Sequence, residues 1–428
     1  MSNNGAGAVT VHASDSQGLV PTLRFPEFRN AGEWVATPLR QLCTPISEKV
    51  GNAKLTPVSI TAGKGFVSQA SKFGRDISGE QYRNYTYLRK GDFAYNKGNS
   101  TAFPQGYVCQ LSEFEEAAAS SAFLCFQLHK QHQPRFIQAL FDQNVHGRQL
   151  ASFITSGARS NGLLNIRSDD FYGVKLPFPP EGEEQQKIAD CLLSLDALIF
   201  AETDKLTALR DHKKGLMQEL FPAEGETTPR LRFPEFQDAG DWEERSLGEI
   251  ATYQNGKAYE PHIVEAGRYI VVNARFISTD GAVKKWSNNP LLIATKDDIL
   301  MVLSDLPNGK ALAKCYRVDE NDKYAVNQRI ARLTPHAVRS DFLFPVLNRH
   351  PYLLGFNDGM NQTHLSKDNV LTCPILLPAD EEEQVAIADC IASVERQIAA
   401  QVDLLCELKA HKSGLMQQLF PSPAGSAA

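Results

Sequence analysis

The sequence predicts an α+β protein in which two repeated domains alternate with two long helices that pack antiparallel. An apolar seam with heptad-like spacing occurs twice in the 428 residues, the second copy 199 positions after the first. A segment reading LRFPEF also occurs twice, from Leu23 and from Leu231. Short strand-like stretches with Gly-rich turns lie between these repeats, so each domain mixes strands and helices.

The long helices are predicted over residues 181–222 and 380–421, where apolar residues recur every third or fourth position. A stretch of about 38 residues would form a rod roughly 57 Å long, and the proline near the end of each stretch stops the helix. The seam residues are Ile188, Leu192, Leu195, Ile199, Glu202, Leu206, Leu209, Lys213, Leu216 and Leu220 in the first helix, and Ile387, Ile391, Val394, Ile398, Gln401, Leu405, Leu408, Lys412, Leu415 and Leu419 in the second.

The seam polar residues and the short connection over residues 223–232 favour an antiparallel arrangement. A parallel arrangement would place Lys213 against Lys412, a contact between like charges in an apolar seam. The antiparallel register that matches apolar residues with each other sets Glu202 against Lys412 and Gln401 against Lys213. We therefore expect each seam lysine to find its acceptor within the seam.

The remaining boundaries follow from the repeats. Residues 1–20 are expected to be disordered, residues 21–180 to form the first domain, residues 223–379 the second, and residues 422–428 a tail. Each domain opens with the LRFPEF segment and a tryptophan, Trp34 or Trp242. The domains are alike at their ends and different in the middle, which predicts two α+β domains of one kind.

The net charge of −6 conceals an uneven distribution. The two helical stretches carry most of the acidic excess, whereas residues 51–110 hold eight basic residues against three acidic ones. A locally basic module favours a polyanionic partner. The eight cysteines form no CxxC pair, so we expect buried thiols and no metal site. The sequence has no run of 18 apolar residues and no signal-peptide core, which predicts a cytoplasmic protein without membrane contact.

Nucleic-acid recognition needs basic side chains for phosphates and Arg, Lys, Asn or Gln for base edges. Candidates occur in Gly- and Ser-bearing loops of both domains, although any one of them could equally be a solvated loop residue. The candidates are Lys64, Lys72, Lys97, Asn99, Arg159 and Asn161 in the first domain, and Asn255, Lys257, Arg275, Lys310, Asn361, Gln362 and His364 in the second.

The order of these pieces resembles the specificity (S, HsdS) subunit of Type I restriction-modification systems over nearly the whole chain. The resemblance rests on the LRFPEF segments with their tryptophans, the GDF and DDI segments at 91–93 and 297–299, the PFPP and LLPA exits, and the EEQ…IAD…HK.GLMQ.LFP helices. It implies two target recognition domains, each reading half of a bipartite sequence in double-stranded DNA. It also implies that the helices set the spacer and dock two methyltransferase (M) subunits, with restriction/translocase (R) subunits joining for cleavage.

The resemblance further implies a non-catalytic chain without cofactors, with S-adenosylmethionine, ATP and Mg on the partner subunits. Two alternatives remain open from the residues. A stand-alone methyltransferase or nuclease is disfavoured because neither a [DN]PP[YF] motif nor a GxxxxGK[ST] loop occurs. A coiled-coil adaptor without DNA binding would explain the helices but not two divergent domains with basic loops.

Overall fold

The computed structural model describes residues 19–61, 63–98, 103–154, 164–306, 310–357 and 362–421. The chain divides into two compact units, residues 1–203 with 404–428 and residues 204–403. Each unit therefore combines one α+β domain with half of each long helix, α5 (Gly182–Leu220) and α11 (Glu381–Leu419). The prediction of an α+β fold with two pseudo-repeated domains and two long helices is confirmed.

The first unit contains two four-stranded sheets and a short antiparallel pair. One sheet has the order β2-β9-β6-β7, the other the order β4-β3-β8-β5, and β1 pairs with β10. Pairing is antiparallel except between β3 and β8. The strands are β1 (Val35–Pro38), β2 (Cys43–Pro45), β3 (Pro57–Thr61), β4 (Gly65–Ser68), β5 (Thr86–Arg89), β6 (Phe93–Asn96), β7 (Tyr107–Gln110), β8 (Glu116–Ala119), β9 (Leu124–Leu128) and β10 (Lys175–Phe178). The short helices are α1 (Gln69–Phe73), α2 (Pro134–Asp142), α3 (Val145–Leu150) and α4 (Ser168–Tyr172).

The second unit repeats most of this topology, although its second sheet has the order β13-β15-β14-β19 and it adds the pair β17-β21. The sheet β12-β20-β16-β18 matches β2-β9-β6-β7, and the parallel pair β14 and β19 matches β3 and β8. Its strands are β11 (Glu243–Ser246), β12 (Ala251–Asn255), β13 (Ile263–Val264), β14 (Tyr269–Val272), β15 (Trp286–Ser287), β16 (Ile299–Val302), β17 (Ser304–Asp305), β18 (Cys315–Arg317), β19 (Tyr324–Val326), β20 (Ile330–Pro335), β21 (Thr363–His364) and β22 (Pro374–Leu377). The short helices are α6 (Leu247–Ile250), α7 (Ala274–Ser278), α8 (Ser340–Leu347), α9 (Pro351–Leu354) and α10 (Lys367–Leu371).

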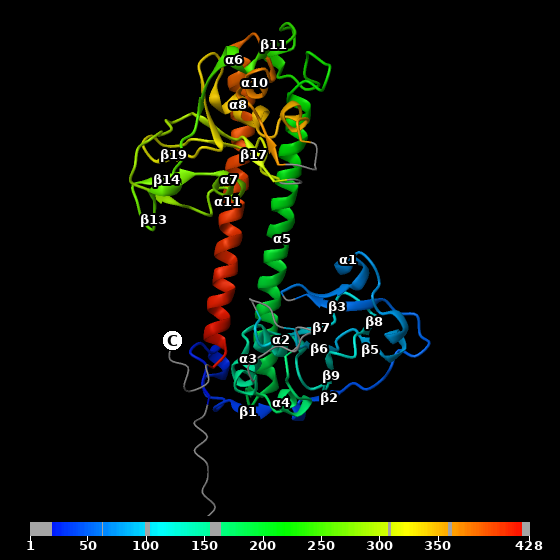
Figure 1. Ribbon diagram of the computed structural model, residues 1–428. Helices are drawn as coiled ribbons and strands as arrows, with labels where there is room; N and C mark the ends of the chain where they lie inside the picture. Colours follow the sequence, from blue (N-terminus) through cyan, green and yellow to red (C-terminus); the bar gives the residue numbers. More distant parts are fainter. Residues whose placement is uncertain are drawn as a thin grey trace, which may run out of the picture. The chain divides into compact units, whose positions relative to one another are not determined.

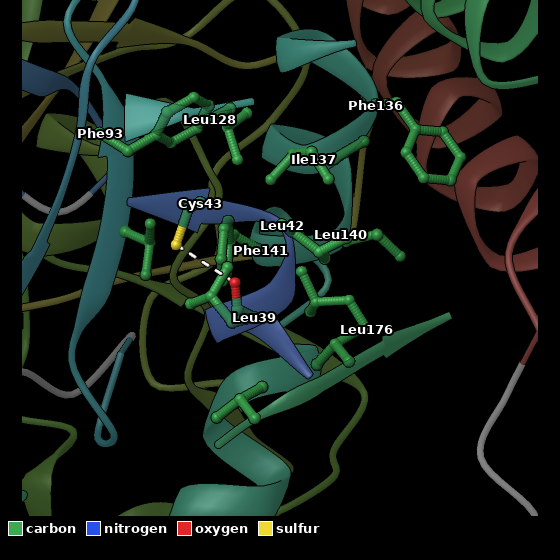
Figure 2. Close-up of a cluster of buried hydrophobic side chains, with 14 of the residues drawn as sticks. Leu39, Leu42, Cys43, Phe93, Leu128, Phe136, Ile137, Leu140, Phe141 and Leu176 are labelled. Carbon is green, nitrogen blue, oxygen red and sulfur yellow. Dashed lines mark hydrogen bonds between the residues drawn. The ribbon is translucent and has the colours of Figure 1, made fainter. Parts of the chain in front are cut away.

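The core of the first unit packs strand residues against helix α2 (Figure 2). Leu39, Cys43 and Phe93 are buried there beside Phe136 and Phe141, and the Cys43 thiol donates to the Leu39 carbonyl oxygen at 3.2 Å. Burial raises the pKa of the Cys43 thiol to about 12, so this cysteine is a small apolar residue of the core.

The end of a long helix completes the aromatic core of each unit. In the first unit, Trp34 packs against Phe136 and against Phe420, which directly follows α11. In the second unit, Trp242 packs in the same way against Phe342 and Phe221, the residue after α5. The repeated LFP sequence is therefore a packing element, because its phenylalanine contacts the tryptophan that opens each domain.

Within each unit the two long helices run antiparallel, as predicted (Figure 1). In the first unit the start of α5 shares a core with the end of α11, where Ile188 and Leu192 lie with Leu419. In the second unit Leu220 lies with Ile387 and Ile391. Every seam residue of the sequence analysis is buried or half-buried.

The predicted partners of the seam lysines are wrong. Lys412 forms an ion pair with Asp196 instead of Glu202, and Lys213 pairs with Glu395 at 2.6 Å instead of Gln401. Both acceptors lie six residues before the predicted ones, and each directly follows a seam residue. A lysine stem can lie along an apolar seam while its ammonium reaches a flanking carboxylate that keeps contact with water. The prediction from the sequence assumed that each seam lysine needs an acceptor inside the seam. This assumption is unnecessary, because the lysine side chain is long enough to reach a carboxylate beside the seam.

Candidate nucleic-acid interface

In the second unit, the buried side chain of Asn327 joins several segments that are far apart in the sequence. Its backbone N–H donates to the Val272 carbonyl oxygen at 3.1 Å, and its amide Nδ2 donates to Glu260 Oε1 at 3.2 Å. The backbone N–H of Lys257 donates to the neighbouring Val326 carbonyl oxygen at 2.9 Å. The segment 256–260 and the end of β14 are thereby held beside the turn that follows β19.

Gly256 makes the close approach of these segments possible. A Cβ atom at this position would lie 1.9 Å from the Asn327 carbonyl oxygen, so no other residue fits without a backbone shift. Lys257, directly after this glycine, is exposed. Its ammonium makes no hydrogen bond or ion pair with the part of the chain that the structure describes, which leaves it available to an external anion.

Two further candidates lie close in the fold to this region. Arg275 is exposed in α7, which begins two residues after Val272. His364 is exposed in β21, where it pairs with Ser304 of β17. The backbone N–H of Leu365 donates to the Leu303 carbonyl oxygen at 2.8 Å, which connects β21 to the end of β16.

The other described candidates of the second domain have more peripheral places. Asn255 ends β12, and its Oδ1 accepts a hydrogen bond from the Tyr253 hydroxyl at 2.6 Å. Lys310 and Gln362 are exposed, and the Lys310 carbonyl oxygen accepts from the Arg349 guanidinium. Asn361 lies outside the described residues.

In the first domain, the ammonium groups of two candidate lysines donate hydrogen bonds to neighbouring segments of the domain. The Lys72 ammonium donates to the Ile60 carbonyl oxygen at 2.8 Å and to Ser59 Oγ at 3.2 Å, and burial lowers its pKa. The Lys97 ammonium donates to the Ile166 carbonyl oxygen at 2.8 Å. Both lysines therefore fasten a neighbouring segment to a strand, a role that loop composition does not reveal.

Lys64 is exposed in the turn between β3 and β4. Gly63 and Gly65 have φ angles of 78° and 81°, so the turn depends on left-handed backbone conformations that glycine adopts readily. Asn99, Arg159 and Asn161 lie outside the described residues. The described residues therefore give no grouping of the first-domain candidates around Lys64.

The repeated strands show which positions of the two domains correspond. Strands β6 and β16 are equivalent because Phe93 pairs with Phe126 as Ile299 pairs with Leu333. The counterpart of Lys97 is therefore Leu303, which is not among the candidates. Lys257 follows β12, whose equivalent is β2, and its own counterpart is the exposed Lys49. Loop composition could not establish this equivalence, because the domains differ most between their repeated ends.

Sequence reasoning also missed Gln328 and Arg329, which are exposed in the turn between β19 and β20. The available signal was the polar run NQR between two apolar strand sequences, YAV and IARL. Of the described residues, no group of His, Cys, Asp or Glu is placed to hold a metal ion. No helix in the described ranges is long and apolar enough to cross a membrane.

The acidic side chains of the second-domain region are occupied by internal hydrogen bonds. Asp305 accepts from the backbone N–H groups of Leu306 and Ala311, at 2.9 and 2.7 Å. Glu260, which is exposed, accepts from the Asn327 amide, as described above. Each of these two carboxylates therefore already has an internal donor.

Comparison with known proteins identifies the class to which this fold belongs. The family described as Type I restriction modification DNA specificity domain matches residues 48–210 and 239–410. The MjaVIII specificity subunit of a Type I restriction enzyme from Methanocaldococcus jannaschii is 25% identical over 268 residues, which cover 58% of this chain and 61% of the relative. The match thus spans less than two thirds of that relative's length.

Two solved structures share the fold. The Type I restriction-modification S subunit of M. genitalium has a TM-score of 0.58 at 17% identity, covering 95% of this chain and all of the other. A chain from a structure described as the basis of complex assembly and conformational transition of the type I R-M system has a TM-score of 0.54 at 17% identity, covering 91% of this chain and 98% of that one. Since the family match extends over most of both halves, the chain belongs to the Type I restriction modification DNA specificity family.

Proposed function

We propose that this chain is the DNA-recognition subunit of a Type I restriction-modification complex and that each domain reads one half of a bipartite target. The observation that carries the proposal is the combination of family membership with two domains of one topology whose exposed loops differ. Equal frameworks place the loops in equivalent positions, and different loops select different bases. A protein with two different recognition surfaces is suited to an asymmetric, divided sequence.

The long helices support a second part of the proposal, the docking of methyltransferase subunits. Leu193, Ala197 and Phe200 are exposed in the first unit's part of α5 and lie on one face because of their spacing. Phe200 is 68% exposed and Leu193 50% exposed. An apolar strip on a helix is a common docking surface for a partner helix. We assign it to the M subunit, with R subunits joining the assembled complex.

In this proposal the chain itself is non-catalytic. S-adenosylmethionine would bind to the M subunits, and ATP and Mg would bind to the R subunits. The residues of this chain would contribute DNA binding, the orientation of the two half-sites and the spacer between them.

Domain exchange tests the reading function. Residues 44–180 would be replaced by the corresponding domain of another family member, and the methylome of a host carrying the complex would be sequenced. One half of the methylated motif is expected to change while the other half and the spacer stay the same. A change in both halves, or in neither, would reject reading by independent domains.

Copurification tests the docking surface. Phe200→Glu is expected to reduce recovery of the M subunit because it places a charge in an apolar contact. Leu198→Glu is the matched control, since Leu198 is also apolar and exposed on α5 but is not three or four positions from any residue of the strip. Equal recovery with both variants would remove the strip from the interface.

A further inference from the structure

The turn between β19 and β20 has a backbone fixed at both ends. The Ile330 N–H donates to the Asn327 carbonyl oxygen at 2.9 Å, closing the turn. The Arg329 carbonyl oxygen accepts from the Leu303 N–H at 2.9 Å, which attaches the turn to the end of β16. Both flanking strands are largely buried, so the turn is held by the core of the domain.

Two long polar side chains project from this fixed backbone. Gln328 and Arg329 are exposed between buried Asn327 and buried Ile330. Across the described ranges neither side chain makes a hydrogen bond or an ion pair. Nearby arginines differ in this respect.

Arg332 on β20 pairs with Asp298 at 2.8 Å, and Arg317 on β18 lies 3.7 Å from Asp297. Those two guanidinium groups already have carboxylate partners. The Arg329 guanidinium, by contrast, has no carboxylate partner among the described residues, so all of its donors can meet an external acceptor.

The chemistry of the pair matches the edges of DNA bases. An arginine fork donates in two directions to guanine O6 and N7, and a glutamine amide pairs with adenine N6 and N7. A fixed backbone lowers the entropy cost of presenting such side chains. Lys257, held beside the turn through the Gly256 contact, is suited to a phosphate.

We infer that Gln328 and Arg329 read base edges in the half-site bound by the second domain, with Lys257 positioning the adjacent phosphate backbone. This inference rests on the proposed function and names the reading element of one domain. The ligand is a base pair in the major groove of double-stranded DNA, the groove in which the four base pairs are distinguishable.

The matching turn of the first domain has different chemistry. It joins β8 to β9, and the Phe123 N–H donates to the Ser120 carbonyl oxygen at 3.0 Å, as the Ile330 N–H donates to that of Asn327. Ser121 and Ala122, both exposed, are therefore the counterparts of Gln328 and Arg329, so the first domain offers a hydroxyl and a methyl group where the second offers an amide and a guanidinium. The two turns would therefore select different bases even though the strands around them are equivalent.

The test uses the complete complex with its M subunits. The wild-type methylome defines the motif, and methylation rates are then measured on duplexes with the motif and with each single base change in it. Arg329→Ala is expected to lower discrimination at one base pair of the second-domain half-site by roughly 5- to 150-fold. Discrimination in the other half-site should remain at the wild-type level.

Arg329→Lys separates base reading from charge. It keeps the positive charge and should preserve the salt dependence of DNA binding, yet lose discrimination because an ammonium lacks the planar fork. Gln328→Ala should relax an adjacent base pair. Arg317→Ala is the control, an arginine of the neighbouring strand with its own carboxylate, and it should leave discrimination unchanged.

Uniform weakening on all duplexes by Arg329→Ala, with full recovery in Arg329→Lys, would identify a phosphate contact and overturn the inference. Unchanged discrimination in every variant would overturn it as well. Exchange of residues 223–379 distinguishes this failure from failure of the proposed function. If that exchange changes one half of the motif while the Arg329 variants do not, only the inference about the turn is rejected.

Discussion

Arg24 and Glu184 form a buried, two-pronged ion pair that attaches the opening segment of the first domain to the first turn of α5. Arg24 Nε donates to Glu184 Oε1 at 2.7 Å and Nη2 donates to Oε2 at 2.6 Å. Arg232 and Glu383 repeat the arrangement in the second unit, with both distances 2.7 Å. The arginine of each LRFPEF segment and a glutamate of each EEQ segment thus recur together because they bind each other.

The two copies differ in the role of the tryptophan. Trp34 Nε1 also donates to Glu184 Oε1, at 3.3 Å. In the second unit Trp242 Nε1 is buried and has no hydrogen-bond partner among the described residues. The first unit therefore has one more donor on its glutamate than the second, although the surrounding sequence is repeated.

Removing the glutamate should destabilise the first unit strongly. Glu184→Gln leaves the buried Arg24 guanidinium without a counter-charge, and breaking such a pair costs about 3–5 kcal/mol of unfolding free energy. Urea unfolding measures the loss. Glu27→Gln is the control, because Glu27 pairs with Lys187 at 3.2 Å with both side chains about half exposed, and it should leave the unfolding free energy nearly unchanged. Equal losses would show that the Arg24 pair is not structurally important.

A double-mutant cycle should locate the partner of Lys213. Lys213→Ala and Glu395→Ala are expected to show a coupling of about 0–1 kcal/mol, because both side chains are partly exposed. The cycle of Lys213 with Gln401 should show a smaller coupling. A larger coupling with Gln401 would contradict the register of the structure and restore the seam pairing expected from sequence.

Acid should destabilise the first unit through His146. This side chain is 1% exposed, and burial lowers its pKa from 6.5 to about 4. The unfolded chain therefore takes up a proton near pH 6.5 while the folded chain stays neutral, and stability is lost as the pH falls from 6.5 to 4. Unfolding free energy should drop by about 2 kcal/mol from pH 7 to pH 5 on this account.

His146→Gln should flatten that pH dependence, because glutamine does not titrate. His411→Gln is the control, since His411 is exposed on α11 in the same unit. If the drop between pH 7 and pH 5 persists in His146→Gln, another group is responsible for it.

Two lysines that look alike in sequence should behave differently. Lys257→Ala is expected to reduce the salt slope of DNA binding by about one and to leave unfolding nearly unchanged. Lys97→Ala should cost about 1–3 kcal/mol of stability, because it removes the hydrogen bond from the ammonium to the Ile166 carbonyl oxygen. Salt-dependent binding and urea unfolding of both variants decide this. The opposite pattern would exchange the two roles.

The architecture was accessible from the sequence because it depends on local periodicity and on repetition. Heptad-like spacing identified α5 and α11, and the repeated ends revealed two domains of one kind. The short connection over residues 223–232 was enough to predict antiparallel helices, since a short connection restricts where the next element can begin. These features are properties of neighbouring residues, and a sequence displays them directly.

The partners of individual side chains were decided by the tertiary structure. Lys213 pairs with Glu395, and Lys97 donates to the Ile166 carbonyl oxygen, because long flexible side chains bind the acceptor that folding brings within reach. Folding alone also creates the candidate reading surface. The Asn327 N–H donates to Val272 and the Asn327 side chain accepts from the Arg329 N–H, while the neighbouring Val326 accepts from the Lys257 N–H. Those residues are separated by up to 72 positions in the sequence, and hydrogen bonds between strand ends hold them together. No local sequence pattern encodes such hydrogen bonds.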